Sequence, residues 1–259
     1  MTTPPAVQLS RISRSYETDN GSVLAVEDVD LHADPGEWVT LIGPSGCGKS
    51  TLFNLVAGLD QPSSGEIRIG GSVLDDRLGA SAYLPQRDAL LPWRRVVDNV
   101  TLPLELAGRP RREARRVAEP LLDRFGLSAF AGSWPWQLSG GMRQRVAVLR
   151  TIVTRPRLLL LDEPFGALDG ITRTDLQQWV GGVLADDGAT VLLVTHDVTE
   201  AVFLSDRVVV MSPRPGRVVA EITVDLPRPR RVEVQETPAF VELEGRLRHE
   251  LRAATWPAA

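Results

Sequence analysis

Short apolar runs recur along the chain and alternate with segments whose apolar residues follow a helical period. This alternation is typical of α/β proteins with a parallel sheet. The run at residues 158–161 is leucine throughout, which predicts a strand buried on both faces. We predict strands near Val7–Ile12, Val23–Val26, Trp38–Ile42, Glu66–Ile69, Ala82–Leu84, Leu158–Leu161, Val191–Val194 and Val208–Met211.

The middle of the chain, residues 87–156, shows little strand pattern. Its helical patterns lie at residues 96–106, at residues 111–125 and again after Ser139, and the last of these ends near Pro156. We therefore predict a helical part at residues 87–156, inserted into a core formed by residues 1–86 and 157–226. A tail at residues 227–259 follows, with a helix at Pro238–Arg252.

Composition and charge narrow the classes of function. The chain has 259 residues, of which 43% are hydrophobic and 24% charged, as in ordinary globular proteins. Its net charge of -4 disfavours a nucleic-acid partner. The arginine-rich stretch 108–117 includes Glu113, which favours a solvated helix over a phosphate-backbone site. The single cysteine, Cys47, excludes an internal disulfide. No apolar run approaches the roughly 18 residues of a membrane span.

The stretch "GPSGCGKS", from Gly43 to Ser50, has the spacing of a phosphate-binding loop. An apolar run, "WVTLI", precedes it and a helical run, "TLFNLVAGL", follows. Glycines let the backbone wrap closely around phosphate oxygens, and the amides at the helix start face the negative charge. We expect Lys49 to reach the β- and γ-phosphates, Ser50 to bind Mg²⁺ and Thr51 to lie toward the α-phosphate.

Two further strands end in residues suited to hydrolysis. In "LLLLDEP", Asp162 is expected to hold Mg²⁺, and Glu163 to orient and deprotonate the attacking water. His196 ends the run "TVLLVTH" and is either a satisfied core histidine or, beside a phosphate site, a contact to the γ-phosphate; the second is favoured. His32 and His249 lack such a setting and are expected at the surface.

These motifs, in this order, resemble the ATP-binding subunit of ABC transporters over nearly the whole chain. "LSGGM" at residues 138–142 matches the family signature, "YLPQRD" the Q-loop, "ALD" at 167–169 the D-loop and "TH" at 195–196 the H-loop. The resemblance implies an α/β fold: a P-loop NTPase (RecA-like) core with an antiparallel β subdomain and an inserted α-helical subdomain. It also implies ATP and Mg²⁺ as cofactors.

The motifs and the resemblance together give a set of site residues. Tyr16 stands where the family places an aromatic ring on adenine, and a role in the core of a strand is the alternative. The expected catalytic residues are Glu163, His196 and Gln86. The expected Mg²⁺ ligands are Ser50, Gln86 and Asp162. The residues expected to bind ATP are Tyr16, Gly43, Pro44, Ser45, Gly46, Cys47, Gly48, Lys49, Ser50, Thr51, Ser139, Gly140, Gly141 and Asp169.

The resemblance also implies partners. In the family, two subunits meet head to tail, and each ATP lies between the phosphate loop of one and the signature of the other. We expect a second copy or a homologous subunit, membrane permease subunits and, indirectly, an extracytoplasmic solute-binding protein, and no nucleic acid. The expected location is the cytoplasmic face of the membrane. An apolar cluster at residues 90–93, which includes Trp93, suits a groove for the permease or, alternatively, the core of the helical part.

The branch of the family is indicated by longer stretches. "RDALLPWRRVVDNV" and "DEPFGALDGITR" resemble importers of nitrate, aliphatic sulfonates and taurine, whereas "LRT" at 149–151 and "LQQWV" at 176–180 are similar to importers of thiamine pyrimidine precursors. The alternatives are the ATPase subunit of an exporter and an ABC ATPase without a transport role.

Overall fold

The strands of the computed structural model, which describes residues 6–19 and 21–255, form two sheets. The antiparallel sheet has the order β2-β1-β4-β5. The other sheet has the order β10-β9-β3-β8-β7-β6 and is parallel except for β10. The bounds are Val7–Thr18 (β1), Gly21–Ala33 (β2), Trp38–Ile42 (β3), Ser64–Ile69 (β4), Ser72–Val73 (β5), Ala82–Leu84 (β6), Leu158–Asp162 (β7), Thr190–Val194 (β8), Arg207–Met211 (β9) and Val218–Thr223 (β10).

The central strands of the parallel sheet, β3, β7, β8 and β9, are buried on both faces because most of their residues are apolar. In β7, Leu159 and Leu161 pack with the helices, whereas Leu158 and Leu160 pack with α1 and the antiparallel sheet. β3, β8 and β9 divide their side chains between the same two cores. The prediction of a doubly buried strand at residues 158–161 is therefore confirmed.

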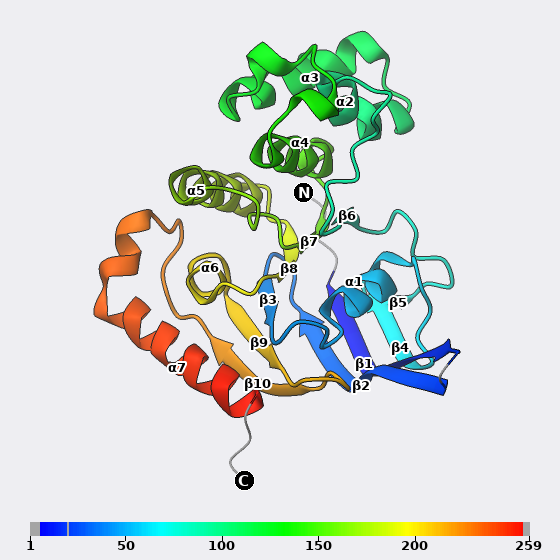
Figure 1. Ribbon diagram of the computed structural model, residues 1–259, viewed down its shortest axis with the longest axis vertical. Helices are drawn as coiled ribbons and strands as arrows, with labels where there is room; N and C mark the ends of the chain where they lie inside the picture. Colours follow the sequence, from blue (N-terminus) through cyan, green and yellow to red (C-terminus); the bar gives the residue numbers. More distant parts are fainter. Residues whose placement is uncertain (1–5, 20, 256–259) are drawn as a thin grey trace.

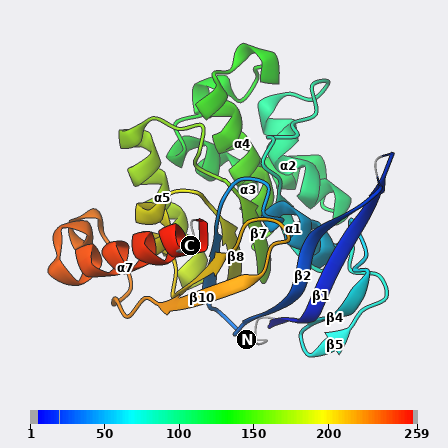
Figure 2. The same ribbon diagram turned by 60° about the horizontal axis from the view of Figure 1, so that its bottom comes forward.

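The helices follow the periodic segments. Figure 1 shows α2, α3 and α4 gathered beyond β6 and β7, at the opposite end of the molecule from α7. Figure 2 shows α7 beside β10, with the antiparallel strands on the other side. The bounds are Lys49–Ala57 (α1), Val96–Leu106 (α2), Arg111–Arg124 (α3), Gly140–Ile152 (α4), Gly170–Asp186 (α5), Val198–Leu204 (α6) and Pro238–Thr255 (α7). Within residues 6–19 and 21–255, no helix is both long and apolar enough to cross a bilayer.

Four elements were not predicted from the pattern. α5 contains three glycines, at positions 170, 181 and 182, and α6 is only seven residues long. β5 has two residues, and β10 is an edge strand in which Val219 stays exposed. The eight strands that were predicted all form, and the exposure of most of α3 agrees with a solvated arginine-rich helix.

The carboxyl ends of the parallel strands position the site. β3 leads into the phosphate loop, β7 ends at Asp162, and β8 leads to Thr195 and His196. Because these neighbouring strands run parallel, residues that are far apart in the sequence meet at one edge of the sheet.

Candidate nucleotide site

The phosphate loop requires glycine at its closest approaches to the rest of the fold. Gly48 has φ +103°, and a Cβ there would lie 2.3 Å from the Val26 Cγ1. A Cβ on Gly43 would lie 2.8 Å from the Met211 carbonyl oxygen. The loop therefore packs tightly against β2 at Gly48 and against β9 at Gly43.

Lys49 is the first residue of α1, and its ammonium group lies within the loop. Its Nζ donates to the Gly43 carbonyl at 2.8 Å and to the Pro44 carbonyl at 2.9 Å. The side chain forms no ion pair with any carboxylate in the described ranges, although the residue is only 8% exposed. The same Nζ also donates to the Cys47 Sγ at 3.5 Å. A nearly buried cation bound to carbonyl oxygens and a thiol sulfur can exchange these contacts for an anion.

A cavity of about 350 Å³ opens over the loop. It collects most of the predicted residues from the phosphate loop and from the ends of β6, β7 and β8. Its wall consists of Ala25, Gly43, Ser45, Gly46, Gly48, Lys49, Ser50, Thr51, Gln86, Asp162, Glu163, Val194, His196 and Arg214.

Asp162 lies beside Ser50 on this wall and is 2% exposed. Burial raises the pKa of Asp162. The hydrogen bond from the Ser50 hydroxyl opposes that shift, the charge of Glu163 adds to it, and the Lys49 ammonium opposes it. A hydroxyl and a buried carboxylate in contact are the hard oxygen ligands that Mg²⁺ accepts when phosphate oxygens complete its shell. The residues present therefore fit this ion, and a bound cation would favour the ionised form of Asp162.

Glu163 stands at the centre of a converging trio. Its Oε2 accepts a hydrogen bond from the Gln86 Nε2 at 3.2 Å, and its Oε1 lies 3.4 Å from the His196 Nδ1. Its backbone has φ +51°, a left-handed conformation that costs a non-glycine residue roughly 1–3 kcal/mol. The Glu163 N–H donates to the Val194 carbonyl at 2.9 Å, which ties this strained turn to β8.

Several predicted residues lie outside this cavity. Ser139, exposed, is the N-cap of α4 and accepts from the Met142 N–H at 3.2 Å. Asp169 is the N-cap of α5, and the Thr172 N–H lowers the pKa of its carboxyl. Neither these caps nor Gly140 and Gly141 line the wall.

Three other predicted contacts are also absent from the cavity wall. Cys47 is 1% exposed and its Sγ lies 3.5 Å from the Lys49 Nζ, and Pro44 contributes its carbonyl to Lys49. The hydroxyl of Tyr16 donates to Asp60 at 2.9 Å, and the Arg14 guanidinium lies 4.6 Å from the centre of its ring. One face of the Tyr16 ring is therefore already covered by a cation.

Three cavity residues were missed from the sequence. Ala25 and Val194 belong to strands and carry no chemical signal. Arg214 donates from Nε to the Gly46 carbonyl at 3.3 Å across a separation of 168 residues. A local pattern cannot indicate a contact at that separation.

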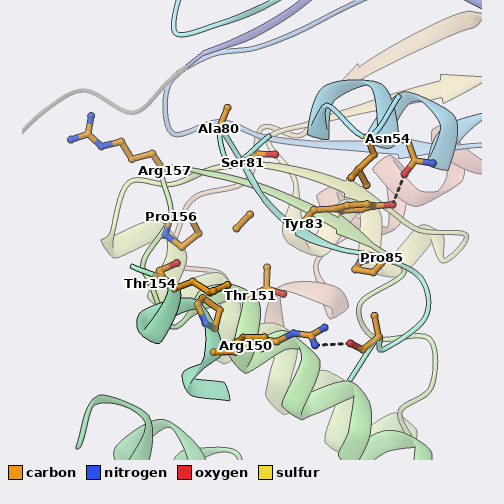
Figure 3. A pocket seen from close by; sticks show the side chains of 17 residues that line it. Asn54, Ala80, Ser81, Tyr83, Pro85, Arg150, Thr151, Thr154, Pro156 and Arg157 are labelled. Carbon is orange, nitrogen blue, oxygen red and sulfur yellow. Dashed lines mark hydrogen bonds between the residues drawn. The ribbon is translucent and has the colours of Figure 1, made fainter. Parts of the chain in front are cut away.

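A larger groove, of about 1000 Å³, lies behind the Q-loop. Figure 3 shows Asn54 and Tyr83, joined by a hydrogen bond of 3.3 Å, on the opposite side of it from Arg150 and Thr151 of α4. Leu59 and Leu106, which are 60% and 80% exposed, add apolar surface. Of the cluster proposed from residues 90–93, none lines the groove; Leu90 is buried and Trp93 is 71% exposed.

Comparison with known proteins agrees with this geometry. The family model described as ABC transporter matches residues 26–166. A nitrate import ATP-binding protein, NrtC, of Synechococcus elongatus is 47% identical over 88% of this chain, which spans 35% of that longer protein. An aliphatic sulfonates import ATP-binding protein, SsuB, of Pectobacterium atrosepticum is 44% identical, with 95% of this chain and 87% of that protein covered.

A solved structure is similar as well. The ATP-binding cassette MJ0796, a dimer bound to ADP and phosphate in a post-hydrolysis state, superposes with a TM-score of 0.77 at 32% identity, covering 85% of this chain and all of that one. The P-loop NTPase fold expected from the sequence is thereby confirmed. With its phosphate loop, strand-end acid and family match in agreement, the chain belongs to the ABC transporter family as one of its ATP-hydrolysing subunits.

Proposed function

We propose that this chain drives an importer of a small solute of the nitrate, sulfonate or taurine type, working as a pair of copies that close on two ATP molecules. The observation that carries the catalytic part is the meeting of Gln86, Glu163 and His196 on the wall of the cavity that Lys49 also lines. The import role is supported by the names of relatives that are 44–47% identical to this chain.

The phosphate loop binds the triphosphate. Loop amides from Ser45 to Thr51 face the phosphates, and Lys49 leaves the carbonyls of Gly43 and Pro44 to pair with the outer phosphate oxygens. Ser50, Asp162 and Gln86 would hold Mg²⁺, which neutralises charge that develops on the phosphates. Tyr16 would stack on adenine with the face of its ring that Arg14 leaves open.

Glu163 orients and deprotonates the attacking water. Its two carboxylate oxygens are held by different partners, Gln86 on one side and His196 on the other, so the carboxylate has little freedom to rotate. The strained backbone at Glu163 projects the side chain from the end of β7 toward the cavity. A fixed base beside the phosphate end of the site contributes typically 10²–10⁴-fold to the rate.

The signature residues complete the site of a second copy. Ser139, Gly140 and Gly141 open α4 at an exposed helix start and do not line the cavity of their own chain. An exposed helix N-terminus binds anions through its bare amides. In a head-to-tail pair it meets the γ-phosphate held by the other copy, with Asp169 close to the same contact. The dimer of the similar cassette MJ0796 supports this arrangement.

The groove behind the Q-loop receives a cytoplasmic helix of the permease. Its apolar wall suits such a helix, and Arg150 of α4 donates to the carbonyls of Asp88 and Ala89, just after Gln86, at 2.7 Å each. Arg143, near the start of α4, pairs with Asp88 at 3.0 Å. These contacts link a permease helix bound in the groove both to the segment after Gln86 and to α4, the helix that begins with the signature residues. The subunit then sits on the cytoplasmic face of the membrane, with a solute-binding protein outside.

The test uses Glu163→Gln. Gln keeps the size of the side chain but cannot accept the proton of water, so we expect turnover to fall at least about 100-fold while ATP binding persists. Light scattering should then detect an ATP-dependent dimer of the variant that does not form with Lys49→Ala. A Glu163→Gln chain that stays monomeric at saturating ATP would contradict the two-copy site.

A further inference from the structure

The turn between β9 and β10, residues 212–217, packs directly on the phosphate loop. The Gly216 N–H donates to the Ala25 carbonyl, and the Gly216 carbonyl accepts from the Glu27 N–H, each at 3.0 Å. A Cβ on Gly216 would lie 1.8 Å from the Cys47 carbonyl oxygen, so the backbones of the two loops are in direct contact at this point. These contacts hold the turn in a fixed position beside the nucleotide cavity.

Hydrogen bonds within the turn limit its freedom. The Ser212 Oγ accepts from the Arg217 N–H at 3.0 Å and donates to the Pro213 carbonyl, also at 3.0 Å. Pro213 and Pro215 flank Arg214, and proline fixes its own backbone φ. Arg214 is therefore presented from a constrained base rather than from a loose loop.

Arg214 and Arg217 differ in their partners. Arg217 pairs with Glu27 at 2.6 Å. Arg214 lines the nucleotide cavity, forms no ion pair with any carboxylate in residues 6–19 and 21–255, and donates only its Nε to a carbonyl, that of Gly46. Its terminal nitrogens are left with donors to spare, and the Nη2 lies 3.6 Å from the place of a Cβ on Gly46. A guanidinium offers five donors in a planar fork that matches phosphate oxygens.

We propose that Arg214 is a second phosphate-binding cation of the nucleotide site, which contacts the phosphate chain of bound ATP or ADP beside Gly46. Lys49 reaches the phosphates from inside the loop, and Arg214 reaches them from the turn that covers the loop's outer rim. The second cation offsets the repulsion that Asp162 and Glu163 exert on a polyphosphate in the same cavity. This assignment rests on the proposed function, because it presumes that the cavity holds a nucleotide.

The experiment measures the Kd of the full chain for ATP and ADP by calorimetry in Arg214→Gln, Arg214→Lys and the control Arg217→Gln. Gln keeps an N–H donor for the Gly46 carbonyl but removes the cation, so a purely structural contact would survive it. We expect Arg214→Gln to raise both Kd values about tenfold, as for loss of a charge-assisted hydrogen bond. Arg214→Lys should recover part of the loss, and the salt dependence of Kd should weaken only in Arg214→Gln.

Measurements on the parent chain and on Lys49→Ala separate failure of the role of Arg214 from failure of the proposed function. If the parent binds ATP, Lys49→Ala does not, and Arg214→Gln binds as tightly as the parent, then the role of Arg214 is overturned and the proposed function stands. If the parent itself binds no nucleotide, the proposed function fails. An equal loss of nucleotide affinity in Arg214→Gln and Arg217→Gln would also overturn the proposal, because it would indicate a disturbed turn rather than a lost contact with phosphate.

Discussion

Glu200 is a carboxylic acid near the start of α6, four residues after His196, and it is 4% exposed. The Gln177 Nε2 donates to its Oε2 at 2.9 Å, while its Oε1 has no hydrogen-bond partner in the described part of the chain. Burial raises the pKa of Glu200 to about 8; the Thr195 hydroxyl opposes the shift, and the charge of Asp197 adds to it. At neutral pH the folded protein therefore keeps this carboxyl largely protonated.

This carboxyl makes stability depend on pH. The unfolded state releases the proton near the ordinary value of 4.5, whereas the folded state holds it to about 8. The folded state thus binds more protons between these values, and the contribution of Glu200 to the free energy of unfolding falls as pH rises through that window.

We expect Glu200→Gln to remove this dependence. Its free energy of unfolding, relative to the parent chain, should increase from pH 4.5 to 8, because Gln needs no proton to remain neutral. Urea unfolding at a series of pH values measures the difference, with Glu242→Gln on the exposed surface of α7 as control. A constant difference across this window would show that the pKa of Glu200 is not raised in the folded state.

Individual site residues were predictable where residues close together in the sequence form the site. The phosphate loop needs consecutive positions on one turn, so those residues between Gly43 and Thr51 that line the cavity could be predicted from the sequence. Glu163 and His196 were predictable because a buried apolar strand ends beside each. Arg214 was not, because its link to Gly46 depends on how β9 and β10 return over the loop.

At the scale of elements, the groove is the proposed link between the permease and the nucleotide site. Its walls come from α1, β6, α2 and α4, and Arg150 fastens α4 to the segment after Gln86. The sequence indicated a docking cluster at residues 90–93, but Leu90 is turned into the core, and the groove is instead lined by Leu59, Leu102 and Leu106. An apolar run alone does not tell which of its residues a tertiary surface exposes.

We expect Leu106→Glu to separate hydrolysis from transport. A carboxylate at this 80% exposed position would have to be desolvated against the apolar permease helix, but it touches nothing in the nucleotide cavity. The ATPase rate of the isolated chain should stay at the parental value, while uptake by the assembled transporter falls at least about tenfold.

Val241→Glu is the matched control, since Val241 is 57% exposed on α7 and does not line the groove. Measurement of both activities in reconstituted vesicles decides the matter. Equal uptake by the two variants would show that the permease does not bind in the groove.

Strands and helices differed in how well their patterns predicted them. Buried parallel strands are short and mostly apolar, so β3, β7, β8 and β9 were expected where they form. α5 and α6 were not expected, because glycines interrupt the first and the second is too short to establish a period. Their start sites are nevertheless marked by Asp169 and Asp197, which cap them through backbone N–H groups.

At the scale of the whole molecule, the phosphate loop and the signature residues of one copy do not line the same cavity. The phosphate loop lines the cavity, while Ser139 stands exposed at the start of α4 and outside the cavity wall. The order of the motifs along the chain did not reveal this separation. The resemblance to the family suggested that the two motifs of one copy bind different ATP molecules. The boundaries at residues 86, 156 and 226 stay predictions. A site divided between copies makes ATP the link that holds the pair together.

Mixing two inactive chains tests this division most directly. Ser139→Asp retains an N-cap for α4 and places a negative charge against the γ-phosphate, and Lys49→Ala removes the phosphate-binding ammonium. Each variant alone should lack ATPase activity. In a mixed pair, one site carries both changes and the other carries neither, so the account predicts that mixing restores ATP hydrolysis. A mixture that remains as inactive as its separate components would contradict the shared site.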